Sequence, residues 1–314
     1  MKPSIGARGP RPYINMIINI KVPATSANLG PGFDSLGLAL GLWNETTITP
    51  ASEFFVQVSG EGADRLSQGK NNLIIRAAQR MGERAGKSLP PFHAECVNAI
   101  PLSSGMGSSS AAILTGLLAG NTLLEYPFLS EEILNLASEM EGHPDNVAPA
   151  LMGGLVVSTM DEGRVIARQI PIGADIQITI ALPDYYLPTK KARAALPKKI
   201  SMKNAVHNIS RAVLVTEAFR IGDLNLLGEA MTDTLHQPYR LPLIPGAQSA
   251  MDAAKEAGAA AVALSGAGPS LIAFSSKAEA GIGESMRRAF DEAGLETRIF
   301  HLGVSSRGAE IQVR

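Results

Sequence analysis

A glycine- and serine-rich loop runs directly into a stretch of small apolar residues at 101–121, PLSSGMGSSSAAILTGLLAGN. Gly105 and Gly107 permit positive φ and close backbone approach, and the residues that follow predict a helix that packs tightly at its start. The first turn of such a helix presents unpaired N–H groups and about half a positive charge, which favours an anion. Serine hydroxyls there can add hydrogen bonds or ligate Mg²⁺. Alone, the segment predicts either a phosphate-binding loop or a flexible turn.

Two familiar nucleotide-binding motifs do not describe this loop. It lacks the lysine that completes a Walker A loop and the third glycine of a dinucleotide fingerprint. It also follows a loop instead of closing a βα turn, which argues against a plain nucleotide-binding module with a Rossmann-type sheet.

Strand-like and helix-like segments alternate along the chain without an obvious repeat. Alternation of apolar and polar residues predicts strands, and apolar residues three or four apart predict helices. The predicted strands cover 17–22, 54–58, 92–97, 164–170, 176–182, 261–264, 271–274 and 297–302, and the predicted helices cover 72–85, 109–124, 130–140, 207–220, 224–235, 247–257 and 278–293. This order predicts an α+β sandwich with helices on one face of a mainly antiparallel sheet.

The length of 314 residues suits two domains. We expect an N-terminal tail at 1–15, an N-terminal domain at 16–165 and a C-terminal domain at 166–314. No Pro- or Ser-rich linker marks the boundary, so the two halves should pack tightly. The tail is positively charged but has no apolar h-region, so it does not read as a signal peptide.

Composition excludes several classes of partner. A formal net charge of -1 provides no basic field for nucleic acid or anionic lipid. No apolar run approaches the roughly 20 residues that a membrane-spanning helix needs. The single cysteine, Cys96, cannot form an internal disulfide and should be a buried small side chain, which suits a reducing compartment. We therefore expect a cytoplasmic protein.

Three other segments concentrate polar side chains. KVPATSANLGPGFDSLGLAL, at 21–40, places Thr25, Ser26, Asn28 and Asp34 in a Gly/Pro-rich turn after a strand. EMEGHPDNVAPALMGG, at 139–154, crowds carboxylates and an imidazole at a helix end, where acids are usually only solvated. ALSGAGPSLIAF, at 263–274, places a glycine turn between two apolar strands, which is typical of either a hairpin or a close approach to a ligand.

Together the four segments resemble motifs of the GHMP small-molecule kinases, over about residues 17–274. PLSSGMGSSSAA is similar to the family's ATP-phosphate motif, with Met106 for the usual leucine and Ser110 for the first alanine. LSGAGPSLIAF is similar to its C-terminal glycine motif. VPATSANLGPGFDSLGLAL, GHPDNVAPALMGG, LPTKKARAALPK and HQPYRLPLIPG resemble its homoserine-kinase branch. The resemblance implies a two-domain fold, with an N-terminal α/β domain like ribosomal protein S5 and a C-terminal ferredoxin-like sandwich.

The resemblance also implies roles for individual residues. Backbone N–H groups from Ser103 to Ser109 would hold the β- and γ-phosphates of ATP, and Ser109 and Glu139 would ligate Mg²⁺, with Glu141 as a substitute for Glu139. The implied ATP-binding residues are Pro101, Leu102, Ser103, Ser104, Gly105, Met106, Gly107, Ser108, Ser109, Ser110 and Ala111, together with Gly266 and Gly268. The implied L-homoserine site consists of Asn28, Asp34, Asn146, Thr189, Arg193 and Arg240, and the implied catalytic group consists of Asn146, Asp145, His143, Glu139 and Ser109.

These residue types suit an amino-acid alcohol as phosphoryl acceptor. Arginine forks match a carboxylate, and Asp34 can receive an ammonium group. Either Asp145 or a water molecule accepts the hydroxyl proton; we expect Asp145 and His143 to organise the site. The resemblance implies a step of threonine biosynthesis and is compatible with a homodimer. Two alternatives stay open: a sibling kinase for mevalonate or a sugar, and a ligand sensor of the same fold without turnover.

Overall fold

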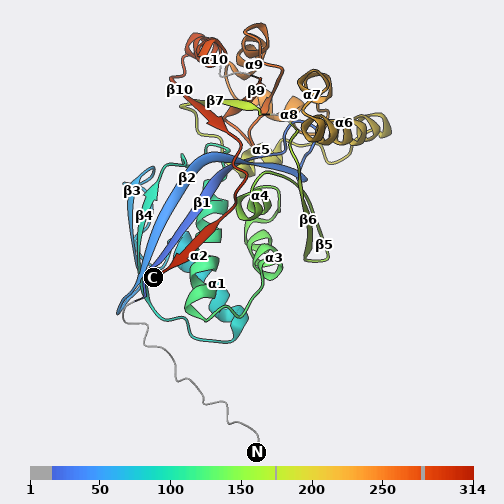
Figure 1. Ribbon diagram of the computed structural model, residues 1–314. Helices are drawn as coiled ribbons and strands as arrows, with labels where there is room; N and C mark the ends of the chain where they lie inside the picture. Colours follow the sequence, from blue (N-terminus) through green and yellow to red (C-terminus); the bar gives the residue numbers. More distant parts are fainter. Residues whose placement is uncertain (1–15, 174, 277–279) are drawn as a thin grey trace, which may run out of the picture.

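Two β-sheets organise the part of the chain that the computed structural model describes, residues 16–173, 175–276 and 280–314 (Figure 1). The larger sheet contains β1 (Ile18–Ala27), β2 (Leu36–Pro50), β3 (Phe55–Gly60), β4 (Phe92–Asn98), β5 (Leu155–Asp161), β6 (Arg164–Ile170) and β11 (Glu310–Val313). Its order is β11-β1-β2-β4-β3, with β5 on β2 and β6 on β5. Only the β3–β4 pair among these is parallel.

The smaller sheet contains β7 (Gln177–Pro183), β8 (Ala261–Leu264), β9 (Leu271–Ser275) and β10 (Thr297–Gly303) in the antiparallel order β10-β7-β9-β8. Helices α9 (Ala247–Glu256) and α10 (Ala280–Glu292) lie over this sheet (Figure 1). The α+β class predicted from the sequence, with mainly antiparallel sheets covered by helices, is confirmed.

Four helices lie beside the larger sheet (Figure 1): α1 (Leu73–Ala85), α2 (Ser108–Leu123), α3 (Ser130–Glu141) and α4 (Val147–Met152). Two glycines allow α1 and α2 to approach closely: a Cβ on Gly116 would lie 2.2 Å from the carbonyl oxygen of Ile74, and one on Gly120 would lie 2.9 Å from the Cβ of Met81. The small residues after the glycine–serine loop therefore make α2 a tightly packed, almost wholly buried helix, as predicted.

The two sheets with their helices form two lobes (Figure 1), and the remaining helices lie along the chain between β7 and α9. They are α5 (Thr189–Ala194), α6 (Met202–Ile221), α7 (Leu224–Ala230), α8 (Gln237–Arg240) and the short 3₁₀ helix η2 (Leu241–Leu243). The single helix predicted at 224–235 was wrong, because α7 ends at Ala230 and a new helix, α8, begins at Gln237. The break has a physical cause: the Asp233 carboxylate accepts backbone N–H groups of Leu235, His236 and Gln237, which starts the second helix.

The C-terminal half of the chain contributes strands to the larger sheet. Strand β11, which the sequence did not predict, returns from the C-terminal end to pair with β1, and the boundary expected at residue 165 falls inside β6, which pairs with β5. The expected tail at 1–15 lies outside the described residues.

Cys96 is buried as predicted, with 3% of its surface exposed. In the described part of the chain, no helix has the length and apolar character to cross a membrane.

Candidate active site

The loop before α2 presents its backbone to the site. Gly107 caps the helix in the left-handed conformation, with φ of 75°. Ser104 Oγ donates to the carbonyl of Pro101 at 2.8 Å and accepts the N–H of Met106 at 3.2 Å, and Met106 is fully buried. The loop is thus anchored from inside. Since the first N–H groups of a helix have no partner within it, the start of α2 forms a binding position for an anion.

The C-terminal glycine turn interlocks with this loop. Ser265 Oγ lies 2.8 Å from the carbonyl oxygen of Gly105 and 2.9 Å from Ser26 Oγ, and the Gly266 N–H donates to the carbonyl of Ala27 at 3.1 Å. A Cβ on Gly105 would lie only 2.2 Å from the Ser265 carbonyl oxygen. Gly105 therefore allows the two lobes to meet beside the anion position.

Asn146 is oriented by β1. Thr25 Oγ1 donates to Asn146 Oδ1 at 2.8 Å, so the amide nitrogen is the end of that side chain that can donate to a ligand. The strand β1 continues beyond the predicted 17–22 through a bulge after Pro23, and this continuation brings Thr25 to the site. Gly107 packs against this hydrogen-bonded pair, because a Cβ there would come within 2.0 Å of Thr25 Oγ1 and 3.3 Å of Asn146 Oδ1.

His143 and Asp145 form a close pair, with His143 Nδ1 at 2.6 Å from Asp145 Oδ1. Burial alone lowers the pKa of His143, but the hydrogen bond with Asp145 and the charges of Asp145, Glu141 and Asp34 outweigh it and raise that pKa above its usual value. Asp145 is 1% exposed. The pair therefore brings a held carboxylate and a cationic or readily protonated imidazole to the floor of the site.

Glu141, the last residue of α3, faces the phosphate loop. Ser109 Oγ donates to Glu141 Oε1 at 2.6 Å, whereas Glu139 Oε2 lies 3.8 Å from Arg80 Nη2 and does not line the cavity described below. The structure thus brings the substitute, Glu141, and not the expected Glu139, to Ser109. Glu139 and Glu141 both lie in α3, and residues two apart on a helix point in directions about 200° apart, so only one of them can face α2.

Arg240 is a buried cation without an anionic partner. Its side chain is 1% exposed, and within the described chain no carboxylate lies within ion-pair distance and Nε has no hydrogen-bond partner. Its Nη1 lies 3.4 Å from the carbonyl oxygen of Gly266 and 3.4 Å from His236 Nδ1, and its guanidinium lies 5.2 Å from the Phe33 ring centre. Burial and the charge of Arg193 lower its pKa, and the charges of Asp34, Asp145 and Asp233 oppose that shift without reversing it. A charge held this way is stabilised when an anion binds.

Asp34 and Arg193 meet across the two lobes. Arg193 donates twice to the Asp34 carboxylate, at 3.0 and 2.9 Å, and both side chains are partly exposed. Asn28 holds this loop in place: its Oδ1 accepts the Asp34 N–H at 3.0 Å and its Nδ2 donates to the Gly266 carbonyl at 2.8 Å. Asn28 therefore joins the loop of Asp34 to the C-terminal glycine turn.

These groups surround one cavity of about 220 Å³ between the lobes. Its lining residues are Asn28, Asp34, Ser103, Ser104, Gly105, Gly107, Ser108, Ser109, Glu141, His143, Asp145, Asn146, Thr189, Arg193, Arg240, Gly266, Ala267 and Gly268. The lining thus combines the serines of the glycine–serine loop and of the first turn of α2 with the two arginines and Asp34.

Most predicted site residues lie on this cavity, and six do not. Pro101, Leu102, Met106, Ser110, Ala111 and Glu139 are absent from its lining. Met106, Ser110 and Ala111 are buried beneath the loop. Sequence reasoning assigned no role to Thr25, Phe33 and His236, although each lies within a quoted segment; their contacts depend on segments far away in the chain.

A second cavity of about 320 Å³ adjoins the first, because both are lined by Ser103, Ser108 and Ser109. It lies between the start of α1 and strands β2 and β4, with Asn72, Asn44 and Leu102 among its lining residues. The anion position at α2 thus connects a polar cavity to a larger, more apolar one.

The two lobes enclose the N-terminus of α2 between a small polar cavity and a larger neighbouring one, which suits a phosphate donor beside a small acceptor. Family models agree: the GHMP kinases N terminal domain matches residues 72–154, and the GHMP kinases C terminal domain matches residues 215–292. The chain belongs to the GHMP kinase family.

Relatives from two bacteria show how far this similarity extends. A homoserine kinase from Moorella thermoacetica is 42% identical over 292 residues, which are 93% of this chain and 99% of that protein. A crystal structure of homoserine kinase from Cytophaga hutchinsonii, 31% identical, aligns with a TM-score of 0.83 over 94% of this chain and 97% of that one. A crystal structure of L. major mevalonate kinase, 17% identical with a TM-score of 0.66 over 90% of this chain and 94% of that one, shares the fold.

Proposed function

We propose that the protein is a homoserine kinase: it transfers the γ-phosphoryl group of ATP to the side-chain hydroxyl of L-homoserine, giving O-phospho-L-homoserine for threonine biosynthesis. Homoserine kinases that share 42% of its residues along nearly their whole length support this function. One structural observation carries it: the cavity joins an anion position to a buried arginine without a carboxylate partner and to the Asp34 carboxylate.

The part of the cavity lined by Asp34, Arg193 and Arg240, which we call the acceptor end, suits a zwitterionic substrate. Arg240 offers the α-carboxylate a buried guanidinium that no carboxylate of the described chain approaches to ion-pair distance, and a bidentate Arg–carboxylate pair would fix the orientation of the substrate. Asp34, which carries two carboxylate oxygens, would receive the α-ammonium group, and Arg193 beside it would hold Asp34 in place. With both charged groups held at this end, the side-chain hydroxyl extends towards Asn146 and the phosphate loop.

The part of the cavity lined by the serines at the start of α2, which we call the donor end, suits Mg-ATP. Backbone N–H groups from Ser103 to Ser109 would hold the β- and γ-phosphates, and the adjoining 320 Å³ cavity has room for the nucleoside. Ser109 Oγ and the Glu141 carboxylate are hard oxygen donors 2.6 Å apart, and Mg²⁺ in kinases uses such a limited protein set together with phosphates. When bound, Mg²⁺ would neutralise phosphate charge.

Phosphoryl transfer through a loose transition state asks mainly for positioning. Asn146, held by Thr25, would donate its amide N–H to the reacting oxygens. Asp145 is occupied by His143, so we assign the pair to organising the acceptor hydroxyl, whose proton leaves to a water molecule or to the phosphate itself.

Asp145→Asn separates an organising role from a general base. We expect kcat to fall by about 10- to 100-fold, because the amide keeps the shape but weakens the hold on His143. Steady-state kinetics with L-homoserine and ATP measure the effect. A fall of about 10⁴-fold in kcat with unchanged KM values, the upper range for loss of a general base, would instead assign proton abstraction to Asp145.

The function itself is tested by turnover of the purified protein with ATP, Mg²⁺ and a panel of alcohols. L-Homoserine should be phosphorylated, with the phosphate on its side-chain oxygen as read by ³¹P NMR. Turnover of mevalonate or a sugar in its place would support a sibling kinase, and nucleotide binding without turnover of any alcohol would support a sensor.

A cytoplasmic location and a homodimer belong to the same proposal. Burial raises the pKa of the Cys96 thiol, so the protein has no reactive thiolate to protect and needs no disulfide. Analytical ultracentrifugation of the full chain measures the assembly state.

A further inference from the structure

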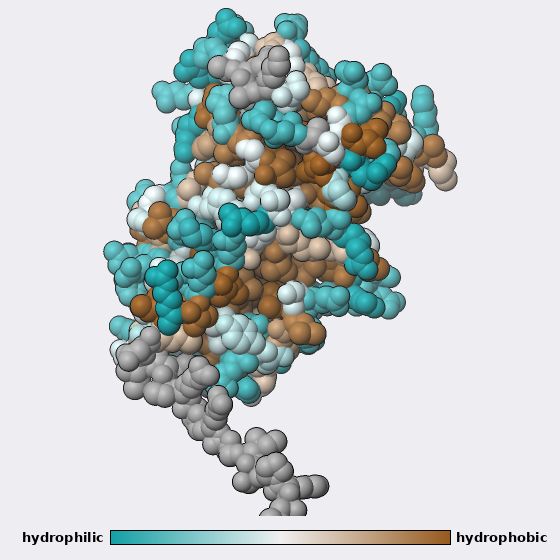
Figure 2. Space-filling model, in the orientation of Figure 1, coloured by the Kyte–Doolittle hydropathy of each residue, from teal (hydrophilic) through white to brown (hydrophobic). Residues whose placement is uncertain are grey.

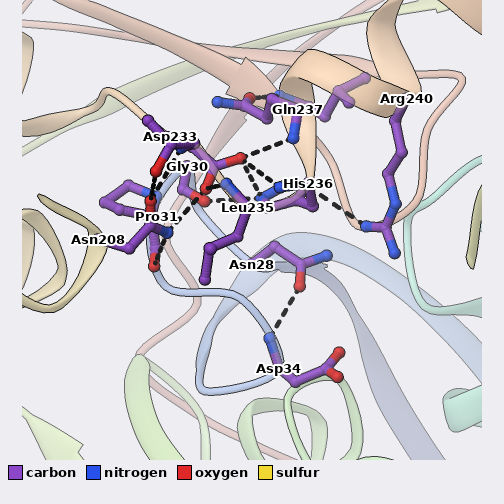
Figure 3. A network of polar contacts seen from close by, with 12 residues as sticks. Asn28, Gly30, Pro31, Asp34, Asn208, Asp233, Leu235, His236, Gln237 and Arg240 are labelled. Carbon is purple, nitrogen blue, oxygen red and sulfur yellow. Dashed lines mark hydrogen bonds and ion pairs between the residues drawn. The ribbon is translucent and has the colours of Figure 1, made fainter. Parts of the chain in front are cut away.

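His236 lies wholly buried behind the acceptor end of the cavity, which it does not itself line. Its Nε2 is 2.7 Å from the carbonyl oxygen of Gly30, its Nδ1 is 3.4 Å from Arg240 Nη1, and its ring stacks on Phe33 with centres 5.2 Å apart. Figure 3 shows the imidazole between the Gly30 loop and the Arg240 side chain. It therefore contacts the loop that carries Asp34 and the arginine that we assign to the carboxylate.

These contacts fix the tautomer of the imidazole. A carbonyl oxygen only accepts, so Nε2 carries the hydrogen that is donated to Gly30. A guanidinium only donates, so Nδ1 must offer its lone pair to Arg240. Burial lowers the pKa of His236; Asp233, whose Oδ2 is 3.5 Å from Nε2, opposes that shift and Arg240 adds to it, so the neutral ring is favoured. Nε2 therefore donates to Gly30, with Asp233 farther away, and Nδ1 accepts from Arg240.

His236 Nδ1 is a neutral hydrogen-bond acceptor, so it orients Arg240 without forming an ion pair with it. A carboxylate in the place of His236 would hold the guanidinium equally well but would cancel its charge. His236 Nδ1 and the Gly266 carbonyl, each 3.4 Å from Nη1, orient the same nitrogen without adding negative charge. These two contacts thereby orient the guanidinium without a direct carboxylate partner, so it stays available to pair with an incoming anion.

The position of His236 is itself fixed by a polar network. Asp233 accepts the N–H of His236 at 2.8 Å and the Nδ2 of Asn208 at 2.7 Å, and the same Asn208 nitrogen lies 3.2 Å from the carbonyl oxygen of Pro31 (Figure 3). The network ties α6 and the start of α8 to the Gly30–Pro31 loop. A small movement of the imidazole is therefore resisted from both sides.

We propose that His236 is a positioning residue for acceptor binding: its Nδ1 lone pair orients Arg240 towards the substrate's carboxylate, and its Nε2–H joins that arginine to the loop of Asp34. This inference rests on the proposed function and names a determinant of specificity for acceptors that carry a carboxylate.

Two substitutions separate this role from mere filling of space. Glutamine can donate its amide N–H to Gly30 and accept from Arg240, whereas leucine can do neither. We expect His236→Leu to raise KM for L-homoserine by about 10- to 100-fold, as for a lost hydrogen bond to a charged group, and His236→Gln to stay within about threefold of the parent. KM for ATP should not change in either variant, which also reports that the fold is intact. Equal impairment of both variants, or an unchanged KM in His236→Leu, would overturn the proposal.

A double-mutant cycle tests whether His236 acts through Arg240. In an Arg240→Met background the leucine substitution should cost little more, because the group that it orients is already gone. The same loss in both backgrounds would show that His236 acts independently and would refute the positioning role. Failure of the parent protein to phosphorylate homoserine would count against the proposed function; the cycle is then run on whichever carboxylate-bearing alcohol of the panel is turned over, where the same outcomes decide.

Discussion

Glu141→Gln should lower kcat by roughly 10²- to 10³-fold, the loss typical of removing one group that stabilises charge in the transition state. The amide keeps the size of the side chain but removes the negative charge beside Ser109 Oγ, which lies 2.6 Å from Glu141 Oε1. Kinetics across a range of Mg²⁺ concentrations measure the effect. Part of the activity should return at high Mg²⁺, because a weakened ligand set still binds the ion at higher concentration.

Glu139→Gln is the matched control, since it makes the same chemical change two residues earlier on the same helix. Its side chain is 45% exposed and its contact with Arg80, at 3.8 Å, is a surface ion pair that contributes little. Activity should stay within about twofold of the parent, as for an ordinary surface change. Loss of activity in Glu139→Gln with an active Glu141→Gln would return the metal site to the residue first expected from the sequence.

The choice between these two glutamates shows where sequence reasoning ended. Helical spacing on 130–140 correctly gave the apolar face of α3, and it favoured Glu139 because that residue flanks the apolar stripe. Which acid reaches Ser109 depends instead on how the last turn of α3 meets the start of α2, two segments joined only by tertiary packing. Spacing within one helix does not contain that information.

The glycine-containing motifs predicted local backbone conformation better, because glycine readily adopts positive φ. Gly105 and Gly107 have the positive φ values expected of the loop, 82° and 75°. The contacts that complete the site join residues far apart in sequence: Asn28 to Gly266 across 238 positions and His236 to Gly30 across 206. The sequence placed these residues in functional segments, but only the fold shows what each one holds.

The early end of α7 has a similar explanation. Nothing in 224–235 forbids a helix, because the stretch has no proline and its only glycine lies inside the observed helix. The interruption comes from Asp233, which caps the next helix and holds His236 in place. Local propensity is a weak guide where a side chain gains more from a tertiary network than the backbone gains from another helical turn.

Arg240→Met should raise KM for L-homoserine by roughly 10²- to 10³-fold, because loss of one partner of a buried charge pair removes most of the affinity for the other. KM for ATP should change little, since Arg240 lies at the acceptor end of the cavity. Arg193→Met is the matched control: that side chain is 44% exposed and already paired with Asp34, so we expect only about a tenfold rise. An unchanged KM for homoserine in Arg240→Met would remove the residue from the substrate site.

Arg240→Met should weaken homoserine binding but should not lower the stability of the substrate-free protein. In the protein without substrate, Arg240 is a buried charge whose Nε has no partner within the described chain, so its burial costs free energy. Methionine fills similar space without that cost. The Tm of the substrate-free Arg240→Met protein, measured by calorimetry, should therefore equal or exceed that of the parent, while the rise in Tm on adding homoserine should be lost. If Arg240 served the structure instead, Arg240→Met would have a lower Tm and would retain its affinity for homoserine. The two measurements together therefore decide whether Arg240 serves substrate binding or folding stability.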